Sequence, residues 1–204
     1  MHPDLDEWLP DAQVRTWHRL SAEADVDGLW RAAQTVRLRD APTLGRAVRW
    51  RIPGTTPELL FRDLLRQYPF AVIDEGSQWS VSGMCGRIWT LRRDYPRIEG
   101  ADDFRAWDEG GTVRVLIAHW IERDGLGRNA LVSETRIKPV NGRASLRLRA
   151  LWAVLGHLER LIGGEVLSVA ARRAEEEELG SANGDFPSLT NGHSPSESYS
   201  AESK

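Results

Sequence analysis

The stretch VRVLIAHWIERDGLGRNALVSETRIK, Val113–Lys138, decides the fold. In both halves the apolar side chains recur at alternate positions, the period of a half-buried strand, and the Gly-containing RDGLGR between them marks a hairpin loop. With the hairpin centred on this loop, His119 faces Ser133 and Ile117 faces Thr135. A slip of one residue would turn every side chain to the opposite face. The sequence therefore predicts two antiparallel strands with one defined register.

This register assigns the hairpin side chains to an inward face and an outward face. The inward face carries Val113, Val115, Ile117, His119, Ile121, Leu131, Ser133, Thr135 and Ile137. The charged side chains fall on the outward face. There, Glu134 and Arg136 are expected to form weak cross-strand pairs with Glu122 or Arg114, each contributing roughly 0.2–1 kcal/mol.

A long amphipathic helix is predicted after the hairpin, over Gly142–Ala174. Its apolar stripe follows spacings of three and four residues and consists of Leu148, Leu151, Trp152, Leu155, Leu158, Ile162, Val166 and Ala170. Glycine is a weak helix former, so a bend is expected between Gly156 and Gly164. A stripe of this length requires a broad apolar partner, which a sheet provides.

The segments upstream complete an α+β layout. The expected strands and helices are a strand at 13–23, a helix capped by Asp25, helices at 41–50 and 57–66, and strands at 70–75 and 78–91. The predicted fold class is a curved antiparallel sheet gripping a long C-terminal helix, with short helices between the first and second strands. Residues 1–12 are expected to be an N-terminal extension, 13–176 the domain, and 177–204 a disordered Ser-rich tail.

Composition limits the function. The 204 residues suffice for one domain with a core. A net charge of -3 argues against a nucleic-acid binder, and no run approaches the roughly 18 apolar residues of a membrane span. Cys85 is the single cysteine, which rules out an intramolecular disulfide and makes a reducing cytoplasm the expected location. The histidines show no ligand spacing, so neither a metal nor a cofactor is expected.

The chain resembles the SRPBCC superfamily, the START/Bet v 1-like helix-grip proteins, and is most similar to small bacterial members. The resemblance is carried by AEADVDGLWRAAQTVRLRD, GMCGRIW, LVSETRIK and LERLIGGEVLSVAARRAE, which are fold signatures without a catalytic motif. It implies an apolar cavity between sheet and helix, used in that superfamily for lipids, polyketides and other hydrophobic ligands. Because members include carriers, receptors and cyclases, the fold does not name the function.

The candidate ligand-binding residues surround this expected cavity. They are His119, Ile117, Val115, Ser133, Thr135, Met84, Trp152 and Leu155. His119 is interpreted as a structural histidine satisfied by Ser133 or Thr135, as a ligand anchor, or as a general acid or base. No inward Asp or Glu is predicted to orient its ring, so no catalytic residue is assigned.

Three functions remain open. The first is non-enzymatic binding of a small hydrophobic molecule, the usual use of an apolar concave site with few polar groups. The second is an enzyme of the polyketide cyclase or dehydratase type that uses His119. The third is a module that binds an unknown protein partner through the acidic, Ser-rich tail.

Overall fold

The computed structural model describes residues 2–52, 54–90, 92, 95–123 and 128–184, without the side chains of 155, 157–163 and 182–184. The helices are α1 (Leu5–Trp8), α2 (Val26–Thr35), α3 (Pro42–Arg51), α4 (Phe61–Leu64), α5 (Ala101–Ala106), α6 (Gly142–Gly163) and α7 (Glu165–Gly184). The strands are β1 (Val14–Ala22), β2 (Ala71–Gly76), β3 (Trp79–Gly86), β4 (Val113–Arg123) and β5 (Asn129–Pro139). Two predicted elements are shorter than expected: the helix at 57–66 keeps only its centre, as α4, and the strand at 78–91 ends at Gly86.

The five strands form one antiparallel sheet in the order β1-β5-β4-β3-β2. In the β4–β5 hairpin, His119 pairs with Ser133 and Ile117 pairs with Thr135, so the predicted register is confirmed. The last strand, β5, lies between its hairpin partner β4 and the first strand, β1, so the first and last strands are hydrogen-bonded neighbours. The predicted fold class, an antiparallel sheet with a C-terminal helix across it, is confirmed as well.

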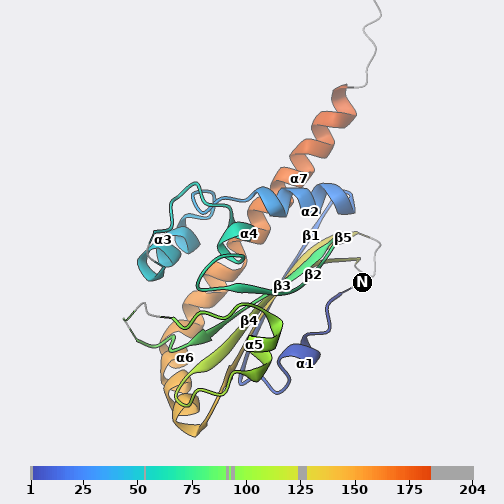
Figure 1. Cartoon of the computed structure of the whole chain (residues 1–204). Helices are drawn as coiled ribbons and strands as arrows, with labels where there is room; N and C mark the ends of the chain where they lie inside the picture. The colour runs from blue at the N-terminus through green and yellow to red at the C-terminus, as the bar shows by residue number, and fades with distance from the viewer. Residues whose placement is uncertain (1, 53, 91, 93–94, 124–127, 185–204) are drawn as a thin grey trace, which may run out of the picture.

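Helices α6 and α7 run along one face of the sheet, here called the inner face, and Figure 1 shows them as one long path that α2 crosses. The path breaks at Gly164, between the two helices, where the glycines predicted a bend. On the inner side Leu148, Val166 and Ala170 of the predicted stripe are buried. The side chains of Leu155, Leu158 and Ile162 lie outside the described residues.

Helix α7 continues to Gly184, so it includes the first residues, 177–184, of the segment that the sequence assigned to the tail. Two carboxylates near this end of α7 accept hydrogen bonds from the backbone. Glu175 accepts from the backbone N–H of Glu23 at 3.1 Å, and Glu178 accepts from that of Asp25 at 3.0 Å. These contacts lie at the start of α2, where the helix dipole favours negative charge. Residues 185–204 of the predicted tail lie outside the described residues.

The outer face of β3, β4 and most of β5 is buried, although the sequence places the charged side chains of the hairpin on that face. Leu116, Ala118 and Trp120 of β4 pack there with Leu5 and Leu9 from the N-terminal segment and with Phe104 of α5, which is fully buried; Figure 1 shows α1 and α5 on the side of the sheet away from α6. The N-terminal segment predicted as an extension thus supplies core residues. Neither short helix was predicted, because each is too short to show a periodic pattern.

Gly83 permits this second layer. A Cβ atom at Gly83 would lie 2.8 Å from two ring carbons of Phe104 and 2.9 Å from Ile73, closer than side-chain contacts allow. The strand glycine therefore marks a close approach of α5 to the outer face of β3.

Arg136 also differs from its prediction. Only 6% of it is exposed, and it pairs with Glu134 (Nε to Oε1, 2.5 Å) and with Asp6 (Nη1 to Oδ1, 2.6 Å) instead of with Glu122 or Arg114. The ion pair ties the N-terminal segment to β5. The hydrogen bond and charge of Arg136 lower the pKa of the Asp6 carboxyl.

Among the described residues, no helix is long and apolar enough to cross a bilayer.

Candidate functional site: a polar band on the inner face

A line of polar side chains crosses the inner face of the sheet. Strand pairing aligns His18 of β1, Ser133 of β5, His119 of β4 and Ser80 of β3 in one row. The neighbouring row contains Thr16, Thr135, Ile117 and Ser82. We call the seven polar members, Thr16, His18, Ser80, Ser82, His119, Ser133 and Thr135, the polar band.

The polar band divides the apolar core of the inner face. On one side, Ile121 and Leu131 pack with α2 and α7. On the other side, Val115 and Met84 pack with Leu148 of α6. Between the two clusters, five members of the band are only partly buried, while Ser82 and Ser133 are buried. The centre of the inner face is therefore its most polar part and less completely covered than its two ends.

His119 is held by two contacts in this band. Its Nε2 lies 3.1 Å from Oγ of Ser133, and its ring meets the ring of Phe61 of α4 edge to face, with centroids 5.3 Å apart. Burial lowers the pKa of the imidazole to about 4. His119 is therefore neutral at pH 7, with one ring nitrogen that donates and one that accepts.

A small cavity adjoins His119 on the side of α2 and α4. Its volume is about 30 Å³, and its lining includes Phe61, Ser80, His119, Leu131 and Val166. A cavity needs roughly 10–15 Å³ to hold a water molecule, whereas ligand pockets measure roughly 300–1,000 Å³. This space suits water and cannot hold the hydrophobic ligand that the sequence led us to expect.

The structure brings most predicted site residues together. Val115, Ile117, His119, Ser133, Thr135 and Met84 share the inner face, and Trp152 of α6 packs on the Val115 side of the band. The side chain of Leu155 lies outside the described residues. Sequence reasoning missed Thr16, His18, Ser80, Ser82 and Phe61. The alternation in VRTWHRLSA of β1 contained a signal for two of them, but only the pairing of β1 with β5 aligns them with Ser133.

Two buried polar atoms, one in the band and one on the ring of a tryptophan, have no hydrogen-bond partner in the described part of the chain. They are the hydroxyl oxygen of Thr16 and the indole nitrogen of Trp89, whose ring packs on the Val115–Met84 side. Buried polar atoms are nearly always paired, with protein or with another molecule. Both can donate, so each is suited to an oxygen acceptor supplied from outside the chain.

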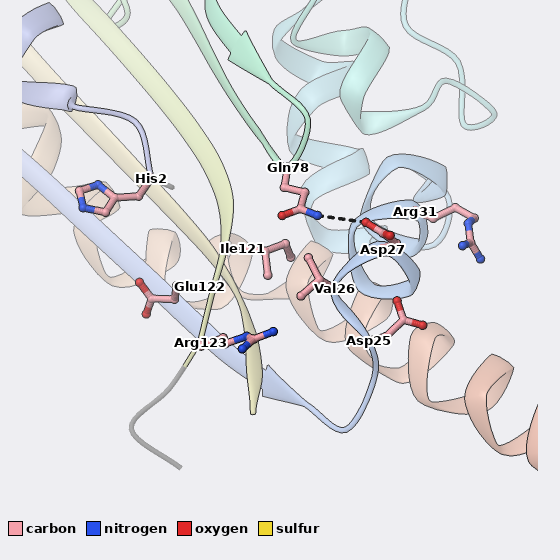
Figure 2. Close-up of a pocket in the computed structure, with 9 residues that line it drawn as sticks. All are labelled: His2, Asp25, Val26, Asp27, Arg31, Gln78, Ile121, Glu122 and Arg123. Carbon is pink, nitrogen blue, oxygen red and sulfur yellow. Dashed lines mark hydrogen bonds between the residues drawn. The ribbon is translucent and has the colours of Figure 1, made fainter. Parts of the chain in front are cut away.

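A larger hollow lies at the far end of β4, and Figure 2 shows its lining residues. Its volume is about 860 Å³. Gln78 donates to Asp27 at 3.0 Å, while Arg31 points away from that pair, and Glu122 is drawn on the other side of the β4 ribbon. Its charged side chains do not converge on one point, so we do not consider it the candidate site.

Comparisons with known proteins give weak structural similarities. No protein-family model and no curated protein matches the chain. A hypothetical protein of Helicobacter pylori aligns with a TM-score of 0.36 at 11% identity, covering 83% of this chain and 93% of that one. The di-domain ARO/CYC StfQ from the steffimycin biosynthetic pathway aligns with a TM-score of 0.33 at 15% identity, covering 86% of this chain and 54% of that one. The terminal oxygenase of carbazole 1,9a-dioxygenase from Nocardioides aromaticivorans aligns with a TM-score of 0.35 at 11% identity, covering 91% and 57%.

Proposed function

We propose that this protein binds a small hydrophobic molecule between the inner face of its sheet and helix α6, without a covalent step. The observation that carries the proposal is the division of the inner core by the polar band. An inner face that served only for packing would gain from apolar side chains at its centre, because each buried apolar side chain contributes roughly 1.5–3 kcal/mol. This protein instead places hydroxyls and imidazoles there, flanked by two apolar clusters.

The arrangement suits a ligand with an apolar body and a polar group. Small-molecule sites are mostly apolar, with few polar groups that fix orientation. Here the Val115–Met84 cluster and the aromatic ring of Trp152 supply apolar surface, and the band supplies hydrogen bonds. The cavity beside His119 on the α4 side is too small for such a ligand, so we place the ligand on the α6 side of the band.

The helix-grip architecture and the sequence signatures also support membership of the SRPBCC superfamily, which we propose for this chain. A reducing cytoplasm is the location we propose, because Cys85 is a free, buried thiol. Small hydrophobic ligands are consistent with both proposals.

Catalysis by His119 receives less support. A catalytic imidazole is normally oriented by a third group, often a carboxylate. Among the described residues the hydrogen-bonding partner of its ring is the hydroxyl of Ser133. Partner binding through the acidic run is also weakened, because Glu175 and Glu178 already accept hydrogen bonds from the segment before α2.

Native mass spectrometry of freshly purified protein tests the proposal, since a co-purified small molecule would appear as an added mass. A second arm titrates the protein with naphthalene and uses a blocking variant, Ile117→Trp, which fills the centre of the inner face. The matched control, Arg15→Trp, places the same side chain on the exposed outer side of β1. Binding lost in Ile117→Trp and retained in Arg15→Trp supports the site. Equal binding by both folded variants would place the ligand elsewhere and overturn it.

A further inference from the structure

We propose that the ligand carries an uncharged oxygen, a hydroxyl or a carbonyl, that bonds to the polar band, and that the site discriminates against carboxylates. This inference rests on the proposed function and specifies its ligand class. Three features of the described residues support it: the absence of charge at the centre of the inner face, the neutrality of its histidine, and the unpaired donors beside it.

The inner-face positions of β1, β3, β4 and β5 carry no Asp, Glu, Lys or Arg within the described ranges except Arg123, which is exposed at the end of β4, four residues beyond His119. An ionised carboxylate that enters such a surface loses its hydration without a charged partner, and that loss costs several kcal/mol. The row of His18, Ser133, His119 and Ser80 continues onto the edge strand β2 with Glu75, which lies opposite Ser80. The carboxylate of Glu75 is exposed and forms an ion pair with Arg66. A second carboxylate is therefore disfavoured there too.

His119 adds no positive charge at neutral pH, because burial lowers the pKa of its ring to about 4. The neutral imidazole and the hydroxyl of Ser133 share one hydrogen bond, which leaves the serine oxygen with further capacity for a ligand hydroxyl. Such a pair satisfies neutral donors and acceptors alike. It has no charge with which to offset the desolvation of an anion.

The hydroxyl of Thr16 and the indole N–H of Trp89 provide donors for a ligand oxygen. The guanidinium of Arg147 lies 6.0 Å from the ring centre of Trp89. Arg147 itself is exposed on α6. It therefore stays in water, where pairing with a carboxylate contributes little. The donors beside the band thus favour an oxygen acceptor without requiring that it be charged.

The test compares naphthalene, 2-naphthol and 2-naphthoate at pH 7.5 by isothermal titration calorimetry. The three probes share one apolar body and differ only in the polar group. We expect 2-naphthol to bind about 10-fold tighter than naphthalene, the effect of one or two net hydrogen bonds, and 2-naphthoate to bind weakest. Thr16→Val, which replaces the hydroxyl by a methyl group, should reduce the preference for 2-naphthol by about 3- to 10-fold and leave naphthalene unchanged. Thr35→Val is the matched control, because its hydroxyl donates to Ala32 within α2.

The outcomes separate this inference from the proposed function. The proposed ligand class is wrong if 2-naphthoate binds as tightly as 2-naphthol, or if Thr16→Val keeps the full preference for 2-naphthol over naphthalene. In either case the proposed binding site itself is still supported, provided that Ile117→Trp blocks binding. Naphthoate binding that is lost in Arg147→Gln would identify that arginine as the source of the charge. If no probe binds, or if Ile117→Trp binds all three as the parent does, the proposed function itself fails.

Discussion

His119 and Ser133 face each other across β4 and β5, with Nε2 of the imidazole 3.1 Å from Oγ of the serine. The two residues lie at the middle of the inner face, where the apolar core divides. The pair therefore connects the register of the hairpin with the chemistry of the candidate site.

Replacing His119 by leucine should keep the fold, because leucine suits the apolar strand positions on either side. The substitution should make the binding free energy of 2-naphthol less favourable by about 1–3 kcal/mol, the cost of leaving a buried polar group unsatisfied. The binding of naphthalene should be nearly unchanged. Calorimetric titration of both probes against the two proteins measures this. If the variant binds both probes like the parent and loses stability, His119 is a structural residue.

Acid should destabilise the protein through His119. The pKa of its imidazole is about 4 in the folded protein, whereas an unperturbed histidine, as in the unfolded chain, has a pKa of 6.5. The unfolded chain therefore binds the proton more tightly. The stability that depends on the neutral ring is complete above pH 6.5 and is lost as the pH falls toward 4. Between about pH 7.5 and about pH 5, this group should account for about 2 kcal/mol of lost unfolding free energy. Urea unfolding at both pH values, compared with His119→Leu, isolates the effect from the carboxyl groups; parallel losses in the two proteins would contradict it.

Arg136→Ala should lower the unfolding free energy by about 3 kcal/mol, because it leaves the partly buried Glu134 with only the more distant guanidinium of Arg15, 3.8 Å away. This exceeds the weak contribution that the sequence predicted for a surface pair. Arg31→Ala is the control, since its ion pair with Glu177 is exposed on both sides and should contribute under about 1 kcal/mol. Urea denaturation measures both. Equal losses in the two variants would mean that burial does not strengthen the Arg136 pair.

Cys85 should be unreactive in the folded protein. It is fully buried, and desolvation raises the pKa of its thiol to about 12, so the reactive thiolate is scarce at neutral pH. Ellman's reagent should modify it at a rate set by unfolding, and immediately in concentrated urea. Modification of the native protein at the rate of a free thiol would show that the outer layer opens readily.

The double variant Glu175→Ala, Glu178→Ala should cost about 1–2 kcal/mol, because two backbone N–H groups before α2 lose their acceptors. Glu176→Ala is the matched control on the same helix. Within the described ranges its carboxylate makes only an exposed pair with Arg172 at 4.0 Å, so its loss should be under about 0.5 kcal/mol. Thermal or urea unfolding compares the variants. A double variant as stable as the control would show that α7 does not hold the start of α2.

The sequence by itself determined what depends on neighbouring residues. The alternation in β4 and β5 and the short loop between them set the register, and with it the inward position of His119 and its partner Ser133. The aspartate before α2 predicted a helix start, and Asp25 indeed accepts from the N–H of Gly28 at 2.7 Å. The weak helix propensity of glycine, also a local property, predicted a bend between Gly156 and Gly164, and the helical path breaks at Gly164.

Only the tertiary structure decided which distant segments meet. The pairing of β1 with β5 and of β3 with β4 extends one predicted pair into a row from His18 to Ser80. The packing of Leu5 and Phe104 on the outer face turned positions expected in solvent into a second core and enclosed Arg136. Strand alternation states which side chains share a face, but the layer that covers a face is chosen by contacts between residues far apart in the chain. Those contacts depend on the burial of complementary apolar surfaces, which no local pattern records.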